Sequence, residues 1–254
     1  MKNTYFISDI HLGFPNETNS KQREQLLLRW FNEIQQTADA VYIVGDLFDF
    51  WFEYKTTVPK GFTRILGKLA ELVDNKIPVY FFTGNHDLWM FGYFENELGI
   101  PVYHEPIQKD INGKKFFIGH GDGLGPGDHG YKFLKKVFRN KLNQKLFNWL
   151  HPDIGIGLAN YWSKKSRYAN GVVEQYKGDE NEWLLIFSKE QEAKEHHDFY
   201  VFGHRHLPLN IKLNNTSCYI NLGDWLTYNS YAVFDGNILQ LKSFTQHPNV
   251  PLAL

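Results

Sequence analysis

The sequence has a single cysteine, no long hydrophobic run and almost no net charge. Only Cys218 among 254 residues is a cysteine, which excludes an internal disulfide and any metal site built from several cysteines. No segment approaches the roughly 18 consecutive apolar residues that a membrane-spanning helix needs. A formal net charge of −1 gives no overall attraction to nucleic acids or anionic membranes. The first residues, MKNTYFISDI, lack the pattern of a signal sequence, so we expect a cytoplasmic protein.

Short β-branched or aromatic runs alternate with segments of helical period, which is typical of layered α/β folds. Helices are expected over 20–37, with Ser20 as the N-cap, and over 61–74. The end of the chain predicts a hairpin that turns at 235–237. The expected strands are 4–8, 40–44, 79–83, 115–118, 199–202 and 218–221.

One segment, residues 132–167, is strongly basic. Its only acid is Asp153, against nine basic residues: Lys132, Lys135, Lys136, Arg139, Lys141, Lys145, Lys164, Lys165 and Arg167. Apolar residues recur in it at helical spacing, which predicts one basic amphipathic helix or a pair. We interpret it as a helical lid inserted at about 128–178 into a single domain that spans 1–254. The apolar stripe either packs on that domain or covers a ligand, and the local charge calls for an anionic partner.

Five of the six expected strands end in residues that can bind a metal ion. The runs FISDIHLG, YIVGDLFDFW, YFFTGNHD, FFIGHGD and FGHRH supply the candidates Asp9, His11, Asp46, Asn85, His120, His204 and His206. Ligands collect at the carboxyl ends of strands in open α/β sheets. We therefore expect these side chains to form one site at one edge of one sheet.

The mixture of carboxylate, amide and imidazole donors suits Mn²⁺, Fe²⁺ or Zn²⁺ better than calcium. Seven ligands are too many for one ion but enough for two if one carboxylate bridges. Two such ions, roughly 3.5–4 Å apart, can bind a bridging hydroxide and clamp the oxygens of a phosphoryl group. Glycines precede Asp46, Asn85, His120 and His204, which would let the backbone turn and leave room for a phosphate.

The ordered motifs D-x-H, G-D-x-x-D, G-N-H-D, G-H and G-H-x-H, which run from residue 9 to 206, resemble those of the calcineurin-like metallophosphoesterases. The resemblance implies a four-layer α/β/β/α sandwich with a centre of two divalent metal ions. Asp46 would bridge the ions. Position by position, the resemblance assigns Asp9, His11, Asp46 and His206 to the first ion and Asp46, Asn85, His120 and His204 to the second.

The same resemblance gives His86 and Asp49 a catalytic role. His86 would stand near the scissile phosphate, where it can stabilise charge or protonate the leaving oxygen, and Asp49 would orient it. The pair could instead only brace its loop. Asp122 and Asp224 also follow strands, but no family ligand falls at either position, so we expect them to be loop or supporting residues.

Within the family, the motif segments and the basic helices resemble the UDP-2,3-diacylglucosamine diphosphatases of lipid A biosynthesis. That resemblance implies hydrolysis of an acylated UDP-sugar to UMP and the acylated sugar 1-phosphate, with Mn²⁺ as the expected metal. It implies substrate contacts from Asn85, His86, Asp128, Ser163, Arg167 and His204. Peripheral contact with the cytoplasmic face of the inner membrane fits a basic amphipathic segment; no obligate protein partner is inferred.

One residue departs from this pattern. The better-known diphosphatases have arginine after the asparagine, where this chain has His86. An arginine would clamp a phosphate through two hydrogen bonds, whereas a histidine cannot.

Two alternatives remain at the level of the sequence. The first is another phosphodiesterase or a nuclease of the same fold, whose basic segment grips a nucleic acid backbone; the apolar stripe argues against it, and no nucleic acid partner is expected. The second is a binding scaffold without catalysis, which would be expected to have lost metal ligands.

Overall fold

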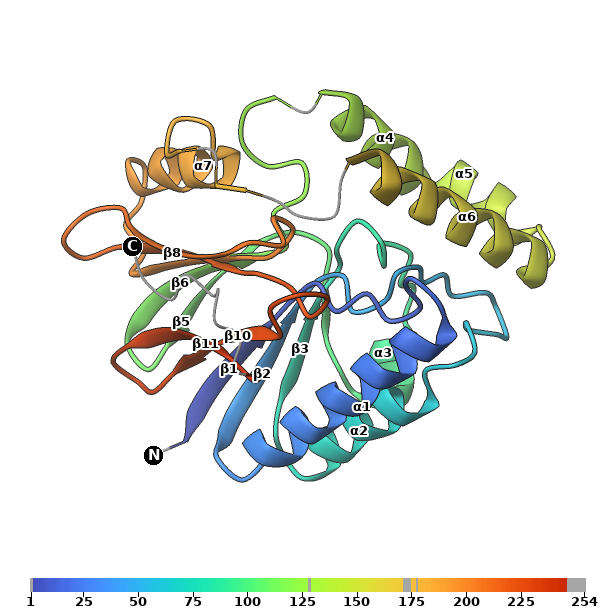
Figure 1. Cartoon of the computed structure of the whole chain (residues 1–254), viewed down its shortest axis with the longest axis horizontal. Helices are drawn as coiled ribbons and strands as arrows, with labels where there is room; N and C mark the ends of the chain where they lie inside the picture. The colour runs from blue at the N-terminus through green and yellow to red at the C-terminus, as the bar shows by residue number, and fades with distance from the viewer. Residues whose placement is uncertain (1, 128, 171–174, 177, 246–254) are drawn as a thin grey trace.

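Two β-sheets lie face to face, and helices cover the outer surface of each (Figure 1). The computed structural model describes residues 2–127, 129–170, 175–176 and 178–245. The first sheet has the order β11-β10-β1-β2-β3-β4 and the second the order β5-β6-β7-β9-β8. In chain order the strands are β1 Asn3–Ile7, β2 Ala38–Val44, β3 Val79–Phe82, β4 Val102–Tyr103, β5 Ile107–Ile111, β6 Lys114–Gly119, β7 Phe199–Phe202, β8 Pro208–Lys212, β9 Cys218–Leu222, β10 Ser230–Phe234 and β11 Leu239–Ser243.

Strand alternation divides the core into three apolar layers. Because successive side chains of a strand point to opposite faces, Tyr5 and Ile7 of β1 pack beneath the helices while Phe6 packs between the sheets. In the second sheet, Val201 of β7 faces the first sheet, while Phe202 packs on the outer face against Leu184 and Leu185 of helix α7 (Trp183–Glu192). The three apolar layers separate four structural layers, so the expected α/β/β/α sandwich is confirmed.

The helices that cover the first sheet are α1 Glu17–Ile34, α2 Thr63–Asp74 and α3 Tyr93–Leu98; α7 Trp183–Glu192 covers the second sheet (Figure 1). Helix α1 begins earlier than expected. Its N-cap is Asn16, whose side chain accepts a hydrogen bond from Asn19 N, so the choice of Ser20 was wrong. The Ser20 hydroxyl instead accepts a hydrogen bond from Gly13 N at 2.7 Å.

The six expected strands all form, within one or two residues, and so does the C-terminal hairpin of β10 and β11. The expectation of a single sheet was wrong, because β1, β2 and β3 belong to one sheet and β6, β7 and β9 to the other. A sequence pattern predicts that strands exist more readily than it predicts which strands pair.

Between β6 and β7 the chain forms the helices α4 His129–Arg139, α5 Lys141–Asn148 and α6 Pro152–Asn170, called here the basic helices. There are three of them where one or two were expected. Part of the apolar stripe packs on the sandwich: Phe138 and Phe147 contact Trp89, with ring centroids 5.4 and 4.8 Å apart. Other apolar side chains stay exposed, among them Trp149 at 82%. Part of the apolar stripe thus packs on the sandwich, and the rest remains exposed as an apolar surface.

Among the described residues, no helix is both long enough and apolar enough to span a membrane.

Candidate metal centre

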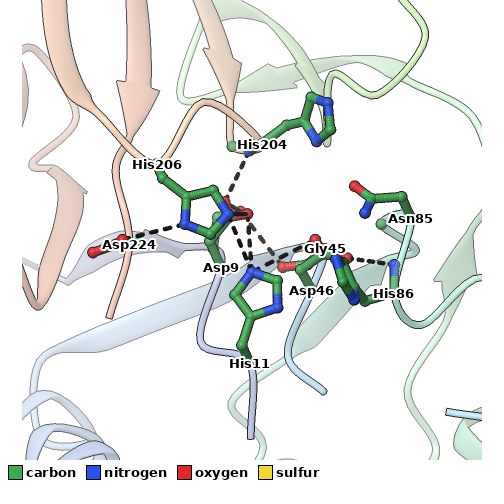
Figure 2. Close-up of polar contacts among 12 residues, drawn as sticks. Asp9, His11, Gly45, Asp46, Asn85, His86, His204, His206 and Asp224 are labelled. Carbon is green, nitrogen blue, oxygen red and sulfur yellow. Dashed lines mark hydrogen bonds and ion pairs between the residues drawn. The ribbon is translucent and has the colours of Figure 1, made fainter. Parts of the chain in front are cut away.

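The expected ligands come from both sheets and meet where the strands end (Figure 2). Asp9 and His11 follow β1 and Asp46 follows β2, in the first sheet. In the second sheet, His120 follows β6, and residues 203–206, called here the GHRH loop, follow β7. Since the carboxyl ends of parallel strands point the same way, two stacked sheets bring their loops to one shared edge.

Five of the seven expected ligands have left-handed backbone conformations, which non-glycine residues rarely adopt. The residues and their φ angles are Asp9 (57°), His11 (49°), Asp46 (55°), His204 (68°) and His206 (48°). Such residues persist only where the surrounding structure enforces them, and they cluster at functional sites. The apolar and polar patterning of the sequence carries no signal for this feature.

Two histidines are held so that Nε2 faces the carboxylates. His120 Nδ1 donates to the Val44 carbonyl at 2.8 Å, and His206 Nδ1 donates to Asp224 Oδ2 at 3.2 Å (Figure 2). A hydrogen bond at Nδ1 selects the tautomer whose Nε2 carries a lone pair, the arrangement found at metal-binding histidines. Asp224 therefore supports a candidate ligand, in agreement with the role expected for it.

The candidate donor atoms lie close together; the side chains of Asp9, His11, Asp46 and His120 are buried, and that of His206 is partly buried. His206 Nε2 is 3.3 Å from Asp9 Oδ1 and 3.2 Å from His11 Nε2. Asp46 Oδ2 lies 3.4 Å from His120 Nε2 and 3.7 Å from His11 Nε2. Asp9 Oδ1 is buried and accepts no hydrogen bond from the described residues. Inward-facing lone pairs and carboxylate oxygens at these distances need a cation or protons between them.

Electrostatics lead to the same conclusion. Burial alone would lower the pKa of His120, but the neighbouring Asp46 carboxylate raises it to about 10. Burial alone would raise the pKa of Asp46, yet His120 and His86 hold it well below its usual range. Burial raises the pKa of Asp9. The carboxylates thus favour positive charge at the centre of the site, which a divalent cation would supply.

Asn85 and His204 lie less centrally. Asn85 Oδ1 is 3.3 Å from His120 Nε2. The backbone N of His204 donates to Asp9 Oδ2 at 2.8 Å, while its ring points away from Asp9 and Asp46 (Figure 2). Its ring centroid is 5.2 Å from that of His120. His204 thus contacts the site through its backbone N–H, and the expected role of its side chain as a metal ligand stays a prediction.

His86 and Asp49 are neighbours, but they meet differently from the arrangement implied by the family. His86 Nδ1 donates to the backbone carbonyl of Asp49 at 2.9 Å, and the Asp49 carboxylate is 3.9 Å away. That carboxylate lies 3.6 Å from His11 Nδ1 and accepts a hydrogen bond from Ser163 Oγ at 2.8 Å. Asp49 thus links His86 and His11 to helix α6. Its contact in α6 is Ser163, which reaches the site from the basic helices.

Asp87, the last residue of the GNHD motif, lies at the site although it was not among the expected site residues. Its buried carboxylate accepts hydrogen bonds from Gly84 N at 2.7 Å and Leu47 N at 2.8 Å, which joins the loops after β3 and β2. Burial, together with the nearby Asp46 charge, raises its pKa to about 7. Its place in the loop is the signal that could have found it, because an aspartate side chain in a turn can accept hydrogen bonds from nearby backbone N–H groups.

The glycines before the ligands are needed for a different reason from the one expected. Only Gly45 among the four has a positive φ, 86°. A methyl group on Gly203 would overlap Ser8 and Asp9, and one on Gly84 would overlap Asp46. The space beside these two glycines is occupied by neighbouring side chains, Ser8 and the candidate ligands Asp9 and Asp46, rather than being open for a phosphate.

Two expected substrate contacts cannot be placed. Asp128 and the Arg167 side chain lie outside the described residues. Asp122, which was expected to fix a loop, accepts a hydrogen bond from Tyr131 Oη at 2.6 Å and forms an ion pair with Lys135 Nζ at 2.6 Å. Through these contacts, helix α4 is attached directly to the loop that carries His120.

Comparison with known proteins decides the family. The sequence model of the calcineurin-like phosphoesterases matches residues 2–208, most of the chain. The chain belongs to this family. The UDP-2,3-diacylglucosamine hydrolase of Porphyromonas gingivalis is 42% identical over 252 residues, covering 94% of this chain and 96% of the relative. The Yersinia enterocolitica protein of the same name is 29% identical over 247 residues, covering 95% and 98%.

Among solved structures, Vacuolar Protein Sorting 29 from Cryptosporidium parvum is a distant neighbour of this phosphoesterase. It is 15% identical, with a TM-score of 0.44, and the match covers 96% of this chain and 92% of that one.

The donor set of this phosphoesterase fits the divalent ions that its family implies. Asp9, His11 and His206 form one compact group of possible ligands, and Asp9, Asp46 and His120 form another. Both groups combine carboxylate with imidazole, which suits borderline divalent cations. Ions bound there would act as Lewis acids on phosphate oxygens and lower the pKa of water. His86, whose backbone N donates to Asp46 Oδ1 at 2.9 Å, lies beside these groups, and its expected catalytic role stays a prediction.

Proposed function

We propose that the protein hydrolyses the pyrophosphate bond of UDP-2,3-diacylglucosamine to give UMP and 2,3-diacylglucosamine 1-phosphate. One observation carries the proposal: an apolar cavity of about 830 Å³ opens directly onto the candidate catalytic residues. Its polar end holds Asp49, Asn85, His86 and Ser163. Its apolar wall consists of Phe50, Trp51, Leu88, Trp89, Leu134, Phe138, Phe147, Leu158 and Ala159, with Tyr131.

An acylated UDP-sugar matches both ends of this cavity. Its pyrophosphate needs cations and proton donors, and its acyl chains need an apolar cover, since each buried CH₂ contributes about 0.8 kcal/mol. Much of the wall comes from α4, α5 and α6. We therefore assign the basic helices as a lid, inserted in one phosphoesterase domain. The names of the relatives in Porphyromonas and Yersinia support the same substrate.

The proposal is tested by measuring UMP release from UDP-2,3-diacylglucosamine with Mn²⁺, the metal we propose. We expect turnover that stops on chelation of the metal and returns when Mn²⁺ is added. UDP-N-acetylglucosamine, which has a short acetyl group in place of the two long acyl chains, should be cleaved at least about 100-fold less efficiently, because the cavity then contributes little binding energy. Equal efficiency on both sugars would refute the role of the cavity.

A nuclease is the one competing function with an observation in its favour, the cationic surface of the basic helices. Single-stranded DNA offered with Mn²⁺ is the direct comparison. We expect it to be hydrolysed more slowly than the acylated sugar, because exposed apolar residues such as Phe133 and Leu142 interrupt the lysines. Faster cleavage of DNA would overturn the lipid proposal.

We further propose that the basic helices rest on an anionic membrane surface. They expose Phe133, Leu142, Trp149 and Ile154 beside lysines, and each basic residue near such a surface contributes about 1 kcal/mol. In sedimentation with phosphatidylglycerol-containing vesicles, Trp149→Ala should lower the partition coefficient roughly tenfold. Ile238→Ala is the matched control, because Ile238 is also exposed but lies at the β10–β11 turn. Equal losses in both variants would contradict docking through the helices.

A further inference from the structure

A buried arginine stands between two of the candidate metal ligands. Arg205 is fully buried and lies between His204 and His206 in the GHRH loop. Its Nε donates to Glu182 Oε2 and its Nη2 donates to Glu182 Oε1, both at 2.9 Å. Glu182 is fully buried as well. The two side chains thus form a bidentate ion pair, the geometry that arginine favours with a carboxylate.

The same guanidinium has two further contacts. Nη2 donates to the Gln175 carbonyl at 2.9 Å, and the group lies over the ring of Trp183, 4.9 Å from its centroid. Glu182 and Trp183 are the N-cap and first residue of α7, and Gln175 stands between α6 and α7 in the sequence. Arg205 therefore connects the GHRH loop to the start of α7 and to the backbone of Gln175.

Stability alone gives a weak reason for such a pair. Removing two charges from water costs several kcal/mol per ion, and well-packed apolar residues often serve equally well. The pair instead restrains the loop, because a planar guanidinium that binds both carboxylate oxygens limits where the Arg205 backbone can lie. The backbone so fixed carries left-handed residues on both sides, His204 at 68° and His206 at 48°.

We propose that Arg205 is a positioning residue for the metal centre. By binding Glu182 and Gln175 it holds the GHRH loop in its strained form, which keeps His206 Nε2 opposite Asp9 and the His204 backbone against Asp9 Oδ2. This inference rests on the proposed metal centre and extends it to residues that touch neither metal nor substrate.

The test is the affinity of metal-free protein for Mn²⁺, measured by calorimetric titration. Arg205→Lys keeps the charge but cannot bond both Glu182 oxygens. We expect its Kd for Mn²⁺ to rise about 10- to 100-fold, the usual cost of losing a supporting contact. At saturating Mn²⁺ the KM for the sugar should stay at the wild-type value, since the cavity is untouched. Lys189→Met is the control: it removes an exposed ion pair with Asp179 from the same helix and should leave the Kd unchanged.

Wild-type Mn²⁺ affinity in Arg205→Lys, with only a lower melting temperature, would overturn the inference and give the pair a purely structural role. Should that variant not fold, the double variant Arg205→Met with Glu182→Leu replaces the pair by apolar groups, which is often tolerated. It too should bind Mn²⁺ weakly, and wild-type affinity there would refute the proposal. A wild-type protein that binds no Mn²⁺ would instead refute the proposed function, and the inference with it.

Discussion

Replacing Asp46 by asparagine should lower kcat/KM for the acylated sugar by at least about 10³-fold, or ~4 kcal/mol. Asp46 Oδ2 lies 3.7 Å from His11 Nε2 and 3.4 Å from His120 Nε2, so it is placed to be shared by two ions. Asparagine has nearly the same shape and can still accept the hydrogen bond from His86 N. It removes the negative charge that two cations would share.

The measurement is steady-state release of UMP at saturating Mn²⁺, with circular dichroism to verify folding. Asp39→Asn is the matched control, because Asp39 is an exposed aspartate of the same strand, β2; its activity should equal that of the wild type. If Asp46→Asn retained more than a tenth of the wild-type kcat/KM, Asp46 could not be the bridging ligand.

A single added methyl group at Gly84 should have an effect of similar size. The new Cβ would overlap the Asp46 carboxylate and lie 2.8 Å from the Asp46 backbone N. Rotation of the Asp46 side chain alone cannot relieve both contacts. We expect Gly84→Ala to bind at most one Mn²⁺ per chain, to lose at least about 10²-fold in kcat and to lower the free energy of unfolding by about 1–3 kcal/mol.

Gly67→Ala provides the comparison. Gly67 lies inside α2 with open space around its Cβ position, so alanine should raise the free energy of unfolding by about 0.5–1 kcal/mol through helix propensity. Metal stoichiometry and kcat should not change. Two bound ions in Gly84→Ala, counted by metal analysis, would show that the close approach of Gly84 and Asp46 is dispensable.

The layered fold was predictable because its signals are local. A continuous apolar run such as Tyr5, Phe6 and Ile7 marks a strand buried on both faces, and turn chemistry marks the hairpin at 235–237. Pairing between distant strands leaves no such local trace. For that reason the sequence indicated one sheet, whereas the strand ends come from two.

The site was predictable as a set of residue types at strand ends, in the order typical of a known family. Its geometry was not. No residue pattern predicts that His86 meets the Asp49 carbonyl rather than its carboxylate, or that the His204 ring points away from Asp46. These details depend on rotamers and loop conformations, which are set by packing between segments far apart in the chain. Arg205 and Asp87 escaped notice for the same reason, since their partners come from other loops.

The left-handed backbone at the ligands has a consequence for how this chain can change over generations. A non-glycine residue in that region costs about 1–3 kcal/mol, so at His11, His204 or His206 a mutation to glycine would relieve backbone strain. Selection for a robust fold alone would therefore erode these histidines. Histidines at several strained positions are therefore expected only where their side chains are needed for activity, and they lower the stability of the fold.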